Sequence, residues 1–140
     1  MKLLVDTNVF LDLFWNRDNQ EAKRFFQFCL IKRNQLYITS QSLRDIEYTT
    51  KRLTHDSNIA KNLQMTAYSS CHKVIGISAD AAIESLYSDV KDYEDSLQIE
   101  AAKESMLDAI ITSNKKDFVN CGIPVFTPKE INDVWAKQKQ

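Results

Sequence analysis

The sequence predicts one α/β domain over residues 1–140, built as a three-layer α/β/α sandwich around a central, mainly parallel sheet of about five short strands. Several short, mostly apolar segments lack polar alternation, which is typical of strands that are covered on both faces. Between them, apolar residues recur at helical spacing. Two Gly and two Pro provide few turns for an all-β fold, and 140 residues suffice for one domain.

The elements alternate along the chain, as the connections of a parallel sheet require. The strand candidates are residues 2–5, 36–39, 74–77, 109–112 and 124–126. Helical spacing of apolar residues covers 22–30, 43–53, 59–67, 79–90 and 95–106. The last helix begins at TPKE, in which Thr127 is the expected N-cap, Pro128 the first helical residue and Glu130 the partner in a capping box.

Composition excludes several classes of protein. The net charge of −1 argues against a broad basic surface that coats nucleic acid. The apolar runs are too short for a membrane-spanning helix or a signal peptide, so we expect a cytoplasmic protein without membrane contact. Three widely spaced Cys without a CxxC pair predict neither a disulfide framework nor a zinc site.

Polar residues follow two of the predicted strands directly. Asp6 comes after the first strand, and Ser113 and Asn114 come after the fourth, with Asp117 one short turn later. Ligands of open parallel sheets bind at the carboxyl ends of the strands, so Asp6 and Asp117 should share one edge if both strands are central. The alternative for Asp6 is that its carboxylate only caps the following helix.

Two further acids lie on or beside the apolar stripes of their helices. Glu47 is next to Ile46, and its alternative role is an i,i+4 pair with Lys51. Asp95 heads a stripe that should face the core, and its alternative is a place in the first turn of a helix capped by Asp92. Clustered carboxylates repel one another unless a cation offsets them, and oxygen ligands without His or Cys favour Mg²⁺ or Mn²⁺.

Four segments together resemble the PIN domain family in order and spacing: LLVDTNVFLD, SLRDIEY, DYEDSLQIEAA, and IITSNKKDF followed by TPKE. The resemblance implies a PIN-like fold and a metal-dependent ribonuclease of the kind found as the toxin of toxin–antitoxin pairs. Carried over position by position, it implies the catalytic acids Asp6, Glu47, Asp95 and Asp117, supported by Asn8, Thr112 and Asn114.

The metal ligands implied in this way are Asp6, Asp95 and Asp117, with Glu47 or Asp92 as a further candidate. Asp108 is another acid near a matched position, and Asp45 is the acid next to Glu47 on the same helix. TSN stands where many members have Thr-Arg-Asn, so Lys115 or Lys116 would have to supply the basic contact to a phosphate.

The function predicted is therefore Mg²⁺- or Mn²⁺-dependent endoribonucleolytic cleavage of RNA, with an antitoxin protein and a second copy of the chain as candidate partners. One alternative is a non-catalytic binding module with the same fold. The other is a haloacid dehalogenase-type phosphatase, which also places an Asp after its first strand. Asn8 disfavours it, because that position would need an acid to protonate the leaving group.

Overall fold

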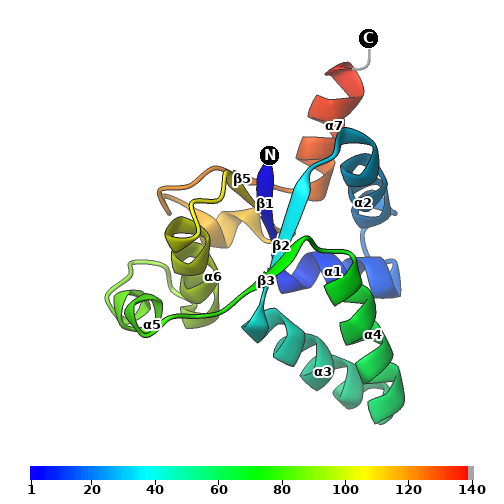
Figure 1. Ribbon diagram of the computed structural model, residues 1–140, viewed down its shortest axis with the longest axis horizontal. Helices are drawn as coiled ribbons and strands as arrows, with labels where there is room; N and C mark the ends of the chain where they lie inside the picture. Colours follow the sequence, from blue (N-terminus) through cyan, green and yellow to red (C-terminus); the bar gives the residue numbers. More distant parts are fainter. Residues whose placement is uncertain (139–140) are drawn as a thin grey trace.

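The computed structural model describes residues 1–138, whose centre is a five-stranded sheet (Figure 1). All strand pairings are parallel, and the spatial order is β3-β2-β1-β4-β5. The strands are β1 (Lys2–Val5), β2 (Gln35–Thr39), β3 (Lys73–Ile75), β4 (Ala109–Ile111) and β5 (Val125–Phe126). All five predicted strands are therefore confirmed, and β1 and β4 are adjacent, as the shared edge for Asp6 and Asp117 requires.

The sheet is covered on both faces, which explains why its strands are uninterrupted apolar runs. Along β1, Leu3 and Val5 belong to one buried core and Leu4 to the other. This alternation is that of a strand, in which successive side chains point to opposite faces. The mainly parallel three-layer sandwich predicted from the sequence is confirmed.

Helices form the two outer layers. They are α1 (Thr7–Trp15), α2 (Glu21–Lys32), α3 (Ser40–Thr54), α4 (Ser57–Ser69), α5 (Ala79–Leu86), α6 (Tyr93–Glu104) and α7 (Pro128–Gln138), with a short 3₁₀ helix, η1 (Lys115–Phe118). Residues of α1, α2 and α7 pack in the core on one face, and residues of α6 and η1 pack on the other. Figure 1 shows α5 and α6 on the left of the sheet and α1, α2, α4 and α7 on the right.

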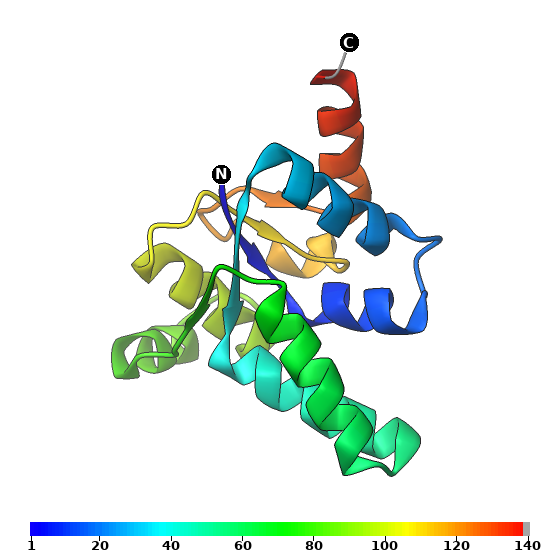
Figure 2. The same ribbon diagram turned by 45° about the vertical axis from the view of Figure 1, so that its right-hand side comes forward.

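The helix α3 starts directly at the carboxyl end of β2 and pairs with α4 as a long helical hairpin (Figure 2). Its buried residues are Ser42, Ile46 and Thr50, spaced by four. These three residues form a buried stripe along α3, so residues on the two sides of this stripe contact different parts of the protein surface.

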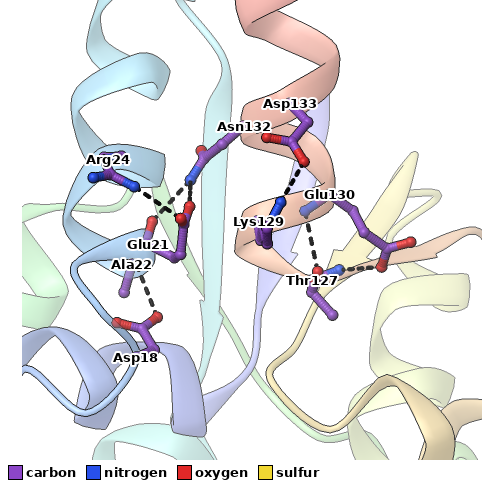
Figure 3. A network of polar contacts seen from close by, with 9 residues as sticks. All are labelled: Asp18, Glu21, Ala22, Arg24, Thr127, Lys129, Glu130, Asn132 and Asp133. Atoms are coloured by element: carbon purple, nitrogen blue, oxygen red, sulfur yellow. Dashed lines mark hydrogen bonds and ion pairs between the residues drawn. The ribbon is translucent and has the colours of Figure 1, made fainter.

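Polar contacts join the helices α2 and α7 at their facing surfaces (Figure 3). The side-chain amide of Asn132 donates hydrogen bonds to the carbonyl oxygen and to Oε2 of Glu21, at 2.9 and 3.0 Å. The predicted capping box is also present, because Thr127 Oγ1 accepts from the amide of Glu130 and Glu130 Oε1 accepts from that of Thr127. These contacts fix the start and the orientation of α7.

One helix is shorter than its apolar spacing predicts. The pattern over residues 79–90 indicates a single helix with Ile83 and Leu86 facing inward, but α5 ends at Leu86, and these two side chains are 53% and 70% exposed. Ala81 and Ser85 are buried instead. Within residues 1–138, none of the helices is both long and apolar enough to cross a membrane.

Candidate active site

Asp6 is at the carboxyl end of the central strand β1 and is only 4% exposed. Its Oδ1 accepts a hydrogen bond from the amide of Thr7 at 2.9 Å. Asp6 therefore caps α1, which was the alternative to a ligand-binding role predicted for it. Its Oδ2 accepts from the hydroxyl of Thr112 at 2.8 Å. Each carboxylate oxygen still has a second lone pair, so capping does not exclude a ligand.

The residues after β4 support Asp6 from the neighbouring strand. Thr112 is fully buried, and its Oγ1 also accepts a hydrogen bond from the amide of Asn114 at 3.1 Å. Asn114 and Asn8 line the same cavity as Asp6. All three supporting residues implied by the resemblance therefore lie at the cavity or contact Asp6.

Asp95 reaches the cavity from the first turn of α6. Asp92 is the N-cap of this helix, and its Oδ1 accepts from the amides of Glu94 and Asp95 at 2.8 and 3.2 Å. Asp92, Glu94 and Asp95 nevertheless all line the cavity that contains Asp6. Asp92 thus caps α6 and positions Glu94 and Asp95 at the cavity. For Asp95, a place in the first turn of a capped helix and a place at the cavity were predicted as alternatives, and here they occur together.

Asp117 lies in η1 and completes the cavity from the β4 side. The loop that carries it is attached to α1, because the hydroxyl of Ser113 donates a hydrogen bond to Asp12 Oδ2. Asp12 Oδ1 accepts from Arg17 Nε at 3.0 Å. Asp12 is 8% exposed, so this acid of α1 is buried and not solvated.

The structure does not bring Glu47 into this cavity. Glu47 is exposed and lines a separate groove on the outer side of α3, whereas Asp45 lines the cavity. The physical reason is the phase of α3, whose buried stripe of Ser42, Ile46 and Thr50 separates the two acids. Leu53, at the end of the apolar pattern over residues 43–53, is 57% exposed. The buried face of α3 therefore differs from the face that this pattern predicts.

The cavity has a volume of about 350 Å³, and six of its thirteen lining residues are acids: Asp6, Asp45, Asp92, Glu94, Asp95 and Asp117. Six residues that line the cavity were not among the predicted site residues: Thr7, Asp45, Tyr48, Thr49, Glu94 and Gln98. Asp45, Tyr48 and Thr49 are spaced as i, i+3 and i+4, which places them on one side of α3 and is the signal that could have found them.

Crowding and burial perturb three of these carboxyl groups. Burial raises the pKa of Asp6 from 3.8 to about 6, against the hydrogen bonds from Thr112 and Thr7. Burial also raises the pKa of Asp45 to about 6. The pKa of Asp95 is raised to about 7 by burial and by the neighbouring charges of Asp6, Asp92 and Asp117.

One buried hydroxyl connects the helices around the cavity. Ser42 Oγ accepts a hydrogen bond from Thr7 Oγ1 of α1 at 2.7 Å and from Gln98 Nε2 of α6 at 2.8 Å. Thr39 Oγ1, at the end of β2, is 3.2 Å from the same atom. Because Ser42 belongs to α3, the elements that carry Asp6, Asp45 and Asp95 are joined at a single atom.

The donor set fits a hard divalent cation, since it consists of carboxylate and amide oxygens whose mutual repulsion a cation would relieve. Within residues 1–138, no three His, Cys, Asp or Glu side chains are placed so that together they could hold a metal ion directly. Mg²⁺ normally binds through one or two carboxylates and keeps several waters, so an open arrangement matches its chemistry.

Asp108 lies outside the site. It precedes β4, at the opposite end of that strand from Thr112, and its Oδ2 accepts a hydrogen bond from the amide of Lys2 at 2.7 Å. Lys115, one candidate for a phosphate contact, forms an ion pair with Glu130 at 2.8 Å.

Fold and cavity together define an α/β/α protein with a carboxylate-lined site at the carboxyl edge of a parallel sheet. The model of the PIN domain family matches residues 2–116, and the chain belongs to this family.

A solved structure described as a toxin–antitoxin complex from Klebsiella pneumoniae contains a similar chain, with 31% identity and a TM-score of 0.64. The match covers 90% of this chain and 97% of that one. The structure of VapBC2 from Rickettsia felis bound to a promoter DNA fragment matches with 15% identity and a TM-score of 0.69, over 91% and 98% of the two chains.

DNA-bound VapBC from Salmonella typhimurium matches with 18% identity and a TM-score of 0.67, again over 91% and 98%. These last two similarities concern the fold alone. A comparison with curated proteins gave no match.

Proposed function

We propose that this protein is a divalent-metal-dependent endoribonuclease and the toxin of a toxin–antitoxin pair. The observation that carries the proposal is the convergence of Asp6, Asp45, Asp95 and Asp117 on one cavity. Membership of the PIN domain family and the similarity to a chain of a toxin–antitoxin complex support it. The family also argues against the phosphatase alternative.

In this proposal Asp6, Asp95 and Asp117 hold Mg²⁺ or Mn²⁺, with Asp45 in the place expected for Glu47. When bound, such an ion stabilises negative charge on a phosphate and lowers the pKa of a water nucleophile. The protein's own residues hold and orient these groups. Thr112 and the amide of Thr7 fix both oxygens of Asp6, so its remaining lone pairs are presented in one orientation.

The polar side chains at the cavity wall position the substrate and the attacking water. Asn8 and Asn114 supply amide groups that can donate to phosphate oxygens or accept from water. Asp45 and Asp95 have raised pKa values in the metal-free protein, so binding of a cation displaces protons from them.

Cleavage of a fluorescently labelled single-stranded RNA in the presence of Mn²⁺ tests the proposal. We expect Asp6→Asn to reduce kcat about 100-fold or more, because it removes a charged ligand from the centre of the cavity. Asp133→Asn is the matched control, since Asp133 is exposed on α7 and pairs with Lys129. Cleavage by the Asp6→Asn variant at the wild-type rate would refute the assignment.

Calorimetric titration with Mn²⁺ separates the enzyme from a non-catalytic module. The enzyme should bind Mn²⁺, and Asp6→Asn should weaken that binding. A protein that neither binds Mn²⁺ nor cleaves RNA, yet binds the product of a neighbouring gene, would instead be a binding module.

The toxin role is tested in cells. Expression of the wild-type chain should arrest growth, and Asp6→Asn should not. Co-expression of the small protein encoded next to it should relieve the arrest by binding the chain. Growth unaffected by the active nuclease would contradict the toxin role while leaving the chemistry in place.

A further inference from the structure

The outer side of α3 carries a groove directly beside the acidic cavity. Its volume is about 350 Å³, and its lining residues are Arg44, Glu47, Tyr48, Lys51 and Arg52. Tyr48 lines both the groove and the acidic cavity, so the two hollows adjoin at this side chain.

The charge of the groove is opposite to that of the cavity. Three cationic side chains face a single carboxylate, that of Glu47. The Arg44 side chain is 78% exposed, and its contact with Asp45 is a long one at 4.0 Å. Lys51 and Arg52 also suit the last turn of α3, whose carbonyl end favours cations. The preference of a helix end for cations accounts for Lys51 and Arg52, but it does not explain why the exposed ring of Tyr48 lies between these cations and the acidic cavity.

Tyr48 is 63% exposed and stands at the boundary between the two hollows. An exposed ring beside cationic side chains provides a surface for stacking an unpaired base, while the cations bind the phosphates that flank it. A duplex offers no such base, because its bases are already stacked and paired.

A second hollow adjoins the cavity at Asp92 and Asp117 and differs from the α3 groove in its charge. It is lined by Lys91 and Lys116 but also by Asp89, Asp92 and Asp117, so acids outnumber bases there. Of these two hollows, the α3 groove has an excess of positive charge and the other has an excess of negative charge.

We propose that single-stranded RNA binds along the α3 groove, with a base stacked on Tyr48 and the adjacent phosphates bound by Arg44, Lys51 and Arg52, so that the chain enters the acidic cavity from this side. The inference rests on the proposed nuclease function and adds the substrate-binding surface to it. Its experiment measures RNA binding separately from cleavage.

Fluorescence anisotropy with a labelled 12-nucleotide single-stranded RNA, in the Asp6→Asn background that leaves the RNA intact, tests the groove. We expect Lys51→Ala/Arg52→Ala to weaken binding about tenfold and to reduce the slope of log K against log salt concentration by about 1.4, as loss of two phosphate contacts requires. The matched control is Lys23→Ala/Lys137→Ala, which removes the same charge from α2 and α7 and should leave the affinity and slope unchanged.

The aromatic contact has its own pair of variants. Tyr48→Ala should weaken binding about fivefold or more, whereas Tyr48→Phe should retain it, because stacking needs the ring and not the hydroxyl. In the wild-type background Lys51→Ala/Arg52→Ala, whose residues line the groove and not the acidic cavity, should raise KM and leave kcat unchanged. Circular dichroism checks that the folded structure is intact.

The outcomes are distinguishable. Equal losses of RNA affinity for Lys51→Ala/Arg52→Ala and for Lys23→Ala/Lys137→Ala would overturn the inference, because RNA would then be attracted by the charge of the whole protein and not by the groove. Normal RNA affinity combined with lost binding of an antitoxin would assign the groove to a protein partner and overturn it too. Absence of RNA binding by the parent together with absence of cleavage by the wild type would refute the proposed function itself, and the inference with it.

Discussion

Replacing Asp6 by Asn should change how the stability of the metal-free protein depends on pH. The pKa of Asp6 is raised from 3.8 to about 6 in the folded protein because the carboxyl group is buried. A raised pKa means that the folded state favours the protonated acid. Its stabilising contribution is complete below about pH 4 and is lost as the pH rises through about 6.

The size of the effect follows from the same two values. A pKa displaced from 3.8 to about 6 corresponds to about 3 kcal/mol of unfolding free energy. Small domains are stable by only about 5–15 kcal/mol, so the change is measurable. The Asp6→Asn variant has no such titration, and its stability relative to wild type should rise by about 3 kcal/mol between pH 3 and pH 8.

Urea denaturation in EDTA, followed by tryptophan fluorescence at several pH values, measures this difference. Loss of the hydrogen bond from Thr112 shifts the variant by a constant amount, so the comparison concerns the pH dependence and not the offset. The exposed control Asp133→Asn should parallel wild type. Parallel profiles for Asp6→Asn and wild type over the whole range would refute the reasoning.

Three further predictions concern the cavity and its surroundings. Mn²⁺ should raise the melting temperature of the wild type more at pH 8 than at pH 5, because bound protons compete with the cation at Asp6 and Asp95. Asp45→Asn should lower kcat about tenfold or more, whereas Glu47→Gln should not lower kcat and should tighten RNA binding, since it removes the only carboxylate among the lining residues of the α3 groove. Asp12→Ala should lower the unfolding free energy by about 1–3 kcal/mol in chemical denaturation and should lower kcat, because the loop after β4 loses its attachment at Ser113.

The sheet could be predicted because its signal is local. Each strand is a short apolar run, and strands buried on both faces need no information from distant residues to be recognised. The positions of Asp6 and Asp117 followed from that signal, since Asp6 comes directly after β1 and Asp117 one short turn after β4, and the carboxyl ends of these strands share an edge.

The phase of the helices could not be predicted as well. Leu53, Ile83 and Leu86 have the apolar character of core residues but are exposed. On α3 the buried face therefore differs from the predicted one, and Asp45 lines the acidic cavity in the place where Glu47 was expected. A short helix with scattered apolar residues allows more than one face to be chosen, and packing against the rest of the fold decides between them.

The burial of Asp12 could not be predicted either, because it depends on a contact between distant parts of the chain. Its carboxylate is buried because Ser113, about one hundred positions later in the sequence, and Arg17 supply its hydrogen bonds. Nothing in the sequence around residue 12 indicates the first of these partners. A burial that depends on a contact so distant becomes visible only in three dimensions.

The shared hydroxyl of Ser42 has a consequence for how this protein can evolve. Thr7, Gln98 and Ser42 come from three helices, and each satisfies a polar atom of another in the interior. A substitution at one of these positions leaves a buried group unpaired, which is more harmful than the loss of a bond on the surface. Among descendants of this chain, positions 7, 42 and 98 should therefore change in concert, and a lineage that alters one should carry a compensating exchange at another.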